Sequence, residues 1–221
     1  MRDRAFARSV AQEHYRPGDP TSWFDVLYQR AEGDEQRIPW ADSHANTSVI
    51  EWLERERPEA AGLRAVVVGC GLGEDAEALA HHGFDVTAFD ISPTAIGWAK
   101  RRWTDSRVNY ICADLFAAPP DWSRAFDFVL ECYTMQALPP DVRPQTVAAI
   151  AALVRENGRL LVVSRARDEQ TPPGDMPWPL TEREVRLFET HGLRMLRLED
   201  YMDREEPPVR RWRALMERTV E

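Results

Sequence analysis

The sequence has no long hydrophobic run and no surplus of positive charge. No stretch of its 221 residues approaches the roughly 18 consecutive apolar residues that a membrane-spanning helix needs. Its 28 Lys and Arg stand against 37 Asp and Glu, a net charge of −9, and such an acidic surface repels both a nucleic-acid backbone and an anionic membrane. We therefore expect no nucleic-acid partner and no membrane partner, and we expect a small-molecule ligand.

Cysteine pairs and a secretion signal are also lacking. Cys70, Cys112 and Cys132 lie within or beside apolar runs and show no ligand spacing, so we expect neither a disulfide framework nor a metal site. The first eight residues, MRDRAFAR, hold no apolar core of the kind that a signal peptide needs. These features predict a cytoplasmic protein with reduced, mostly buried thiols.

Segments of strand and helix character alternate through the middle of the chain. A β-branched run at 64–69 ends in glycine, and helix formers follow it at 74–82 before Gly83. Alternation at this spacing predicts an α/β fold with a doubly wound, mostly parallel sheet, because right-handed crossovers permit little else. Strands are expected at 64–69, 85–90, 108–113, 126–131 and 158–164, and helices at 74–82, 93–103 and 140–154.

The end of the chain departs from this alternation. Residues 181–190 are helical in pattern, and residues 194–201 and 209–219 read as strands on either side of a turn-rich segment at 203–208. The composition of 209–219 fits a helix equally well. The strand interpretation predicts an antiparallel carboxyl-terminal hairpin and a sheet of seven strands.

The first 60 residues carry three tryptophans and two helical patterns. Two interpretations stay open here. The helices pack on the sheet with Trp23, Trp40 and Trp52 as core, or the segment from Trp23 to Trp40 caps a ligand. We treat residues 1–60 as an amino-terminal helical cap segment and residues 61–221 as the main domain of one globular unit. The two helices are expected at 22–30 and 47–57.

Three glycines at alternate positions follow the first predicted strand. Gly69, Gly71 and Gly73 let the backbone approach a ligand with no Cβ in the way. A dinucleotide-binding turn needs its third glycine one residue later, where this chain has Glu74, and a carboxylate there would repel a pyrophosphate. The turn therefore favours a neutral or zwitterionic ligand, the alternative being a tight turn with no ligand.

Two aspartates end the next two predicted strands. Asp90 is placed to accept hydrogen bonds from both hydroxyls of a ribose, with Ile91 against the adenine face. A helix cap is the alternative for Asp90, although Ser92 fills that position more naturally. Asp114 is the natural acceptor for the exocyclic amine of adenine. Because ligands of open α/β sheets bind where strand ends meet, we expect one site here.

Four of these segments resemble the S-adenosylmethionine-binding motifs of class I methyltransferases, and the match is closest to the thiopurine and thiol or halide methyltransferase group. In that group a turn like residues 69–75 is followed by a motif like residues 90–92. Its loop after the fourth strand resembles residues 131–140, and its amino-terminal Trp and Pro-Trp pair resembles Trp23 and residues 39–40. The four segments are 66–75, 89–92, 113–115 and 126–131.

The resemblance covers residues 20–165 and implies a seven-stranded, Rossmann-like class I methyltransferase fold with S-adenosylmethionine as cofactor. It implies a small, soft methyl acceptor, first of all a thiol, or a related sulfur, selenium, tellurium or halide species. A small-molecule O- or N-methyltransferase and a non-catalytic S-adenosylmethionine-binding protein stay open as alternatives. The residues expected to bind the cofactor are Trp23, Trp40, Gly69, Gly71, Gly73, Asp90, Ile91, Asp114, Leu115 and Glu131.

Methyl transfer from a sulfonium needs aromatic faces and little acid–base chemistry. Trp23, Trp40 and Tyr133 are candidates for the attraction between an aromatic ring and the sulfonium cation. Glu131, at the end of a buried strand, is expected to pair with the cofactor's α-amino group, the alternative being an ordinary surface acid. A thiol with a pKa near 8.5 already supplies some thiolate, so a thiol acceptor needs mainly positioning. Tyr133 is a candidate catalytic residue for orienting the acceptor, and His44 is a candidate because it is the one histidine expected near the cap.

The acceptor side is less defined by the sequence. Arg143 and Arg165 are candidates for holding an anionic acceptor, with solvated ion pairs as the alternative. The proline-rich segment 171–180 either folds over the acceptor with Trp178 as its anchor or forms a surface linker. We expect the protein to act as a monomer or a weak homodimer.

Overall fold

Seven strands form one mixed sheet in the order β3-β2-β1-β4-β5-β7-β6 in the computed structural model, which describes residues 3–16 and 18–220. β1 to β5 run parallel, and β7 lies antiparallel between β5 and β6. The predicted fold and its carboxyl-terminal hairpin are confirmed, and residues 210–218 are strand, not helix. Met1 and Arg2 of the predicted leaderless amino end lie outside the described residues. The strands are β1 Arg64–Val68, β2 Asp85–Asp90, β3 Asn109–Cys112, β4 Phe126–Cys132, β5 Val154–Arg165, β6 Leu193–Met202 and β7 Arg210–Arg218.

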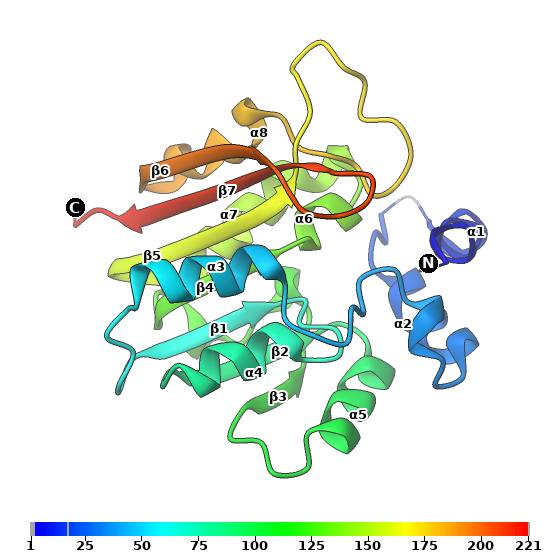
Figure 1. The fold of residues 1–221 in the computed structure, drawn as a ribbon, viewed down its shortest axis with the longest axis horizontal. Helices are drawn as coiled ribbons and strands as arrows, with labels where there is room; N and C mark the ends of the chain where they lie inside the picture. Colours follow the sequence, from blue (N-terminus) through cyan, green and yellow to red (C-terminus); the bar gives the residue numbers. More distant parts are fainter. Residues whose placement is uncertain (1–2, 17, 221) are drawn as a thin grey trace.

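Helices cover both faces of the sheet, as the alternation of elements predicts (Figure 1). α3 (Thr47–Glu56), α4 (Glu74–His81) and α5 (Pro93–Arg102) pack on one face. α7 (Arg143–Leu153) packs on the other, together with α8 (Glu182–Arg186) and η5 (Leu187–His191). The remaining elements are α1 (Arg4–His14), α2 (Ser22–Ala31), η1 (Glu35–Arg37), η2 (Leu115–Ala117), η3 (Pro120–Trp122), α6 (Thr134–Ala137) and η4 (Pro140–Val142).

The start of α5 shows how local sequence fixes an element. The Ser92 hydroxyl accepts a hydrogen bond from the backbone N–H of Ala95, and Pro93 occupies the first turn, where no N–H is needed. Asp25 of α2 reaches the same point, because it accepts from the Ser92 hydroxyl at 2.6 Å and from the backbone N–H of Thr94 at 3.1 Å. The amino-terminal segment is thereby attached at the carboxyl ends of the parallel strands (Figure 1).

The first 60 residues divide between the two interpretations offered by the sequence. Trp52 of α3 is 2% exposed and stacks on Phe128 of β4, so α3 belongs to the core that packs on the sheet. Trp23 is equally buried, in a separate cluster that α1 and α2 form near α5. Trp40 is only partly buried. α1, which the sequence pattern did not indicate, packs its small buried face of Ala7 and Val10 on α2.

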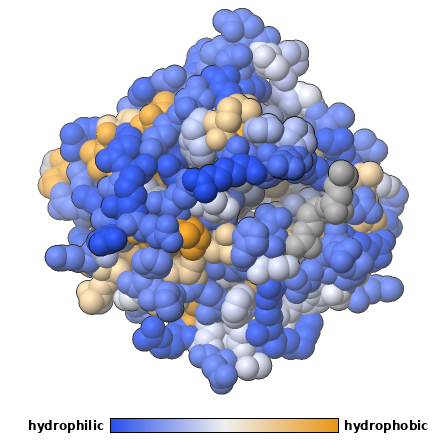
Figure 2. Space-filling model, in the orientation of Figure 1, coloured by the Kyte–Doolittle hydropathy of each residue, from blue (hydrophilic) through white to orange (hydrophobic). Residues whose placement is uncertain are grey.

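Hydrophilic residues cover most of the face shown in Figure 2. On the face shown in Figure 2 the hydrophobic residues form small, separate patches. No helix within residues 3–16 and 18–220 has the length and hydropathy to cross a bilayer. Neither observation points to a large apolar surface on the face shown.

Trp52 supplies a test of the core. Its ring lies 5.1 Å from that of Phe128 at an interplanar angle of 21°, and its buried indole N–H has no partner in the described part of the chain. We expect Trp52→Ala to lower the free energy of unfolding by about 3–5 kcal/mol in urea titrations. Trp52→Phe keeps an aromatic ring and removes the unpaired donor, so it should cost less than half as much; equal losses would contradict the assigned stacking.

Candidate cofactor and acceptor site

The turn after β1 depends on glycine for conformation and for space. Gly71 and Gly73 have φ angles of +54° and +93°, in the left-handed region. A Cβ on Gly71 would lie 3.1 Å from the Tyr28 hydroxyl, and one on Gly73 would lie 2.3 Å from the Tyr110 hydroxyl. Any larger residue at these two positions would therefore both strain the backbone and collide with a tyrosine.

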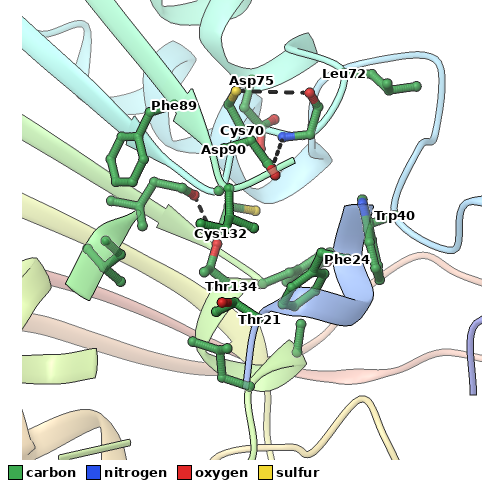
Figure 3. A pocket seen from close by; sticks show the side chains of 18 of the residues that line it. Thr21, Phe24, Trp40, Cys70, Leu72, Asp75, Phe89, Asp90, Cys132 and Thr134 are labelled. Atoms are coloured by element: carbon green, nitrogen blue, oxygen red, sulfur yellow. Dashed lines mark hydrogen bonds between the residues drawn. The ribbon is translucent and has the colours of Figure 1, made fainter. Parts of the chain in front are cut away.

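The carboxylate of Asp90 holds this turn to the start of α5. One oxygen accepts from the backbone N–H of Gly71 at 2.9 Å (Figure 3). The other accepts from the backbone N–H of Ser92 at 2.9 Å. Asp90 is 7% exposed, and burial raises its pKa above the ordinary value. Asp90 also lines a pocket at the carboxyl ends of the strands, which we call the inner pocket.

Most of the predicted cofactor residues line this inner pocket together. Gly71, Asp90 and Asp114 come from the ends of three consecutive strands, as expected. Among the described residues, the inner pocket is lined by positions 21–138 only. The other predicted residues that line it are Trp40, His44, Gly69, Ile91, Leu115 and Tyr133.

Three predicted residues do not line the inner pocket. Trp23 lies behind Phe24, on which it stacks at 4.0 Å, and Phe24 takes the pocket position. Gly73 begins α4 just outside the lining. Glu131 is 0% exposed, so it is not the surface acid of the alternative interpretation. Cys132, its neighbour, lines the pocket in its place.

Glu131 is held inside the protein beneath the loop that carries Tyr133. Its Oε1 accepts from the backbone N–H of Met135 at 2.8 Å, which fixes the start of α6. Its Oε2 has no hydrogen-bond partner within residues 3–16 and 18–220. Burial raises the pKa of this carboxyl from its ordinary value of 4.5 to about 7. A role toward the cofactor's amino group stays a prediction.

The inner pocket is acidic. Asp42, Glu74, Asp75, Asp90 and Asp114 line it, and no Lys or Arg is found among its described lining residues. Such a set favours a cationic sulfonium and an ammonium group and provides acceptors for ribose hydroxyls and an adenine amine. It opposes a diphosphate, in agreement with the position of Glu74 at the start of α4. This set of acceptors therefore fits S-adenosylmethionine and does not favour a nicotinamide dinucleotide.

Aromatic rings form the other part of the lining. Phe89 lies on the side of the strands, whereas Phe24 and Trp40 lie on the side of the amino-terminal segment (Figure 3). The indole N–H of Trp40 donates to the Tyr28 hydroxyl at 2.7 Å, which sets the orientation of the Trp40 ring. The sequence pattern did not single out Phe24 and Tyr28, although their four-residue spacing places both on one face of the helix with Trp40 as a nearby aromatic.

Asp75 is a further lining residue that the motifs did not single out. Its carboxylate accepts from the backbone N–H of Asn46 at 2.6 Å and so ties the segment before α3 to α4. Burial raises its pKa. Glu74 beside it forms an ion pair with Arg102 at 2.9 Å. These contacts join residues 28 or more positions apart, so no local sequence motif predicts them.

A second, larger chamber adjoins the inner pocket and shares six lining residues with it: Trp40, Asp42, His44, Asn46, Tyr133 and Ala137. Its walls add the amino end of α1, Arg165 at the end of β5, and the turn between β6 and β7 at residues 203–209. We treat this outer chamber as the candidate acceptor site.

The two arginines that the sequence indicates for the acceptor side occupy different environments. Arg165 lines the outer chamber. Arg143 is 1% exposed, pairs with Glu184 and donates to the backbone carbonyl of Trp178 at 2.8 Å. It lines neither cavity, so Arg143 is part of a buried ion pair and does not hold an acceptor.

Segment 171–180 is anchored at Trp178, as one of its two interpretations predicts. The backbone N–H of Trp178 donates to the Gln136 carbonyl at 2.8 Å, in addition to the bond that its own carbonyl accepts from Arg143. Met176 of the same segment lines the outer chamber. The segment therefore contributes to the wall of the candidate acceptor site.

The buried Glu131 predicts a pH-dependent difference in stability. Because its folded pKa of about 7 lies above the ordinary 4.5, the folded state favours the protonated acid. Stability from this group is fully present below pH 4.5 and is lost as the pH rises through 7. Glu131→Gln has no such loss and keeps an acceptor for Met135. Denaturant unfolding at several pH values should show wild type losing about 3 kcal/mol relative to this variant; parallel curves would contradict the placement.

The family model of thiopurine S-methyltransferase matches residues 30–220 of the chain. A ubiquinone biosynthesis O-methyltransferase of Aromatoleum aromaticum is 33% identical over 162 residues, which cover 72% of this chain and 61% of that protein. A thiopurine S-methyltransferase of Aliivibrio fischeri is 26% identical over 159 residues, covering 64% of this chain and 72% of that one. The chain spans about three fifths of the length of several curated relatives that it matches.

Solved structures agree in fold. The 1,6-didemethyltoxoflavin-N1-methyltransferase of Burkholderia thailandensis, with S-adenosylhomocysteine bound, aligns with a TM-score of 0.70 at 19% identity and covers 93% of both chains. At this identity the likeness supports the architecture alone. The family match extends over most of the sequence and includes every strand of the sheet. The chain therefore belongs to the thiopurine S-methyltransferase family of S-adenosylmethionine-dependent methyltransferases.

Proposed function

We propose that this protein transfers the methyl group of S-adenosylmethionine to a small, soft nucleophile, first of all a thiol. The observation that carries the proposal is an acidic, aromatic-walled inner pocket that opens to a separate chamber through Trp40, His44 and Tyr133. Membership of the thiopurine S-methyltransferase family supports the same reaction class.

The lining residues have distinct roles in this proposal. Asp90 would accept from the ribose hydroxyls with the lone pairs that Gly71 and Ser92 leave free. Asp114 already accepts from the backbone N–H of Phe116 through one oxygen, and its other oxygen would accept from the adenine amine. Trp40 and Tyr133 would border the sulfonium, where an aromatic face contributes about 0.5–2 kcal/mol of cation attraction. The bound cofactor supplies the electrophilic methyl group.

A thiol acceptor suits the groups at the junction of the two cavities. Burial raises the pKa of the Tyr133 hydroxyl well above its ordinary range, so it keeps its proton at neutral pH and can donate a hydrogen bond but not act as a base. His44 is exposed, and its Nδ1 lies 2.9 Å from the Ala45 carbonyl. A thiol needs no strong base, because a fraction is ionised at neutral pH and exclusion of water then strengthens the nucleophile.

A small-molecule O-methyltransferase is the second candidate. The match of 33% identity to a ubiquinone biosynthesis O-methyltransferase favours it. An oxygen acceptor has a higher pKa than a thiol and would depend on a base at the junction, so the effect of removing His44 separates the two candidates.

We also propose that the protein works in the cytoplasm as a monomer or a weak homodimer. Cys70, Cys112 and Cys132 are all free in the structure, which suits a reducing compartment. Size-exclusion chromatography with light scattering at several protein concentrations would measure the oligomeric state directly.

Asp90 tests cofactor binding. Asp90→Ala leaves the N–H groups of Gly71 and Ser92 without their acceptor and removes the proposed ribose contact, so the dissociation constant for S-adenosylhomocysteine should rise at least about tenfold in calorimetry. Asp90→Asn keeps one acceptor oxygen, so its dissociation constant should lie between those of wild type and Asp90→Ala. Asp121→Ala, at an exposed position on η3, is the matched control. If folded Asp90→Ala binds S-adenosylhomocysteine with wild-type affinity, the assignment of the inner pocket to the cofactor is wrong.

The acceptor class is tested by kinetics with small thiols. We expect wild type to methylate an aromatic and an alkyl thiol, with kcat/KM rising with pH to a plateau that follows each thiol's own pKa. His44→Ala should change kcat/KM for thiols by less than about threefold. If wild type methylates phenols but no thiols, and His44→Ala abolishes this activity, the O-methyltransferase is favoured. If the cofactor stays intact with every acceptor tested, a non-catalytic binding protein is favoured.

A further inference from the structure

Arg165 stands out among the cations of the outer chamber. It ends β5 and lines the chamber, half-buried. Its backbone N–H donates to the Gln136 side chain at 2.7 Å, but its guanidinium makes no hydrogen bond or ion pair with any residue that the structure describes. An arginine side chain offers five donors and stays protonated. A half-buried guanidinium without a protein partner is therefore suited to an anionic ligand.

The described lining of the outer chamber holds five arginines and six carboxylates, and two of these carboxylates already pair with the arginines beside Arg165. Arg211 pairs with Asp203 at 2.6 Å and with Glu205, and Glu205 also lies 3.6 Å from Arg4. Asp203 and Glu205 therefore already have cationic partners in Arg4 and Arg211. Burial, and then the neighbouring Arg4 and Arg211, lower the pKa of the Arg165 guanidinium, with Glu205 as a weaker opposing influence. A bound anion would relieve this repulsion.

The backbone places Arg165 next to the proposed site of methyl transfer. The Tyr133 backbone N–H donates to the Val163 carbonyl at 3.0 Å, and Arg165 follows two residues later, so the Val163 and Arg165 side chains leave the strand on one face. Arg165 also pairs in register with Arg211 of β7, whose guanidinium lies 5.0 Å from the centre of the Tyr133 ring. The free cation and the tyrosine that borders both cavities are therefore neighbours.

We infer that Arg165 binds a carboxylate on the methyl acceptor, and hence that the substrates are thiols that also carry a carboxylate. The inference rests on the proposed function. The planar guanidinium can hold a carboxylate through two parallel hydrogen bonds. The acidic inner pocket repels the same group, so the carboxylate turns outward and the sulfur points toward the cofactor.

The test compares 2-mercaptobenzoate with thiophenol, which differ by the carboxylate. In Arg165→Gln, KM for 2-mercaptobenzoate should rise at least about tenfold while kcat changes by less than about threefold, and the constants for thiophenol should stay as in wild type. The control is Arg159→Gln, six residues earlier in the same strand, where the side chain is 51% exposed beside Glu217. Equal effects of Arg165→Gln on both thiols, or no effect on either, would overturn the inference.

A binding measurement separates this inference from the proposed function. Calorimetry on wild type saturated with S-adenosylhomocysteine should detect benzoate but not benzamide, and Arg165→Gln should lose benzoate binding while circular dichroism shows an unchanged fold. If wild type methylates no thiol yet binds benzoate through Arg165, the thiol assignment fails and the anion site stands. If wild type methylates thiophenol and 2-mercaptobenzoate equally well and does not bind benzoate in preference to benzamide, the anion site fails and the proposed function stands.

Discussion

The buried carboxylate of Asp90 is the contact on which the inner pocket depends. It joins the glycine turn after β1 to the first turn of α5 through the N–H groups of Gly71 and Ser92. Ser92 in turn donates to Asp25, which carries α2 and its aromatic residues to the same corner. Two carboxylates and one hydroxyl thus align the sheet, a crossover helix and the amino-terminal segment around a single space. Burying a charged group is costly unless it is hydrogen-bonded, and here each oxygen of Asp90 has a backbone donor.

Local sequence rules predicted the sheet and the cofactor corner well, because both follow from short-range patterns. Strand ends of a parallel sheet meet at one edge, so Asp90 and Asp114 could be assigned to one site from their positions alone. A dinucleotide-binding turn could be excluded because Glu74 occupies the position where such a turn needs its third glycine. The hairpin of β6 and β7 was harder to predict, because the composition of residues 209–219 fits a helix as well as a strand. Pairing with β5 makes this segment a strand.

The rest could not be predicted because it depends on contacts between distant residues. Arg143 was a candidate for holding an anionic acceptor, yet it forms a buried ion pair with Glu184, 41 positions later. The contact of Glu131 with the backbone N–H of Met135 at the start of α6 is not part of any strand-end motif. Trp23 and Phe24 are adjacent, and which one lines the inner pocket depends on the packing of α2, not on the motif. α1 has only two fully buried side chains, too few for a clear periodic signal.

The two cavities share part of their lining, but among the described residues only the outer chamber uses the last third of the chain, and this difference has an evolutionary consequence. The inner pocket takes its described lining from residues 21–138, whereas the outer chamber extends to residues 165–211. The turn between β6 and β7 can therefore lengthen, shorten or change charge without disturbing the residues around Asp90. Relatives that share one methyl donor can diverge in what they modify by altering this turn, and grafting it from one member to another is a direct route to a new specificity.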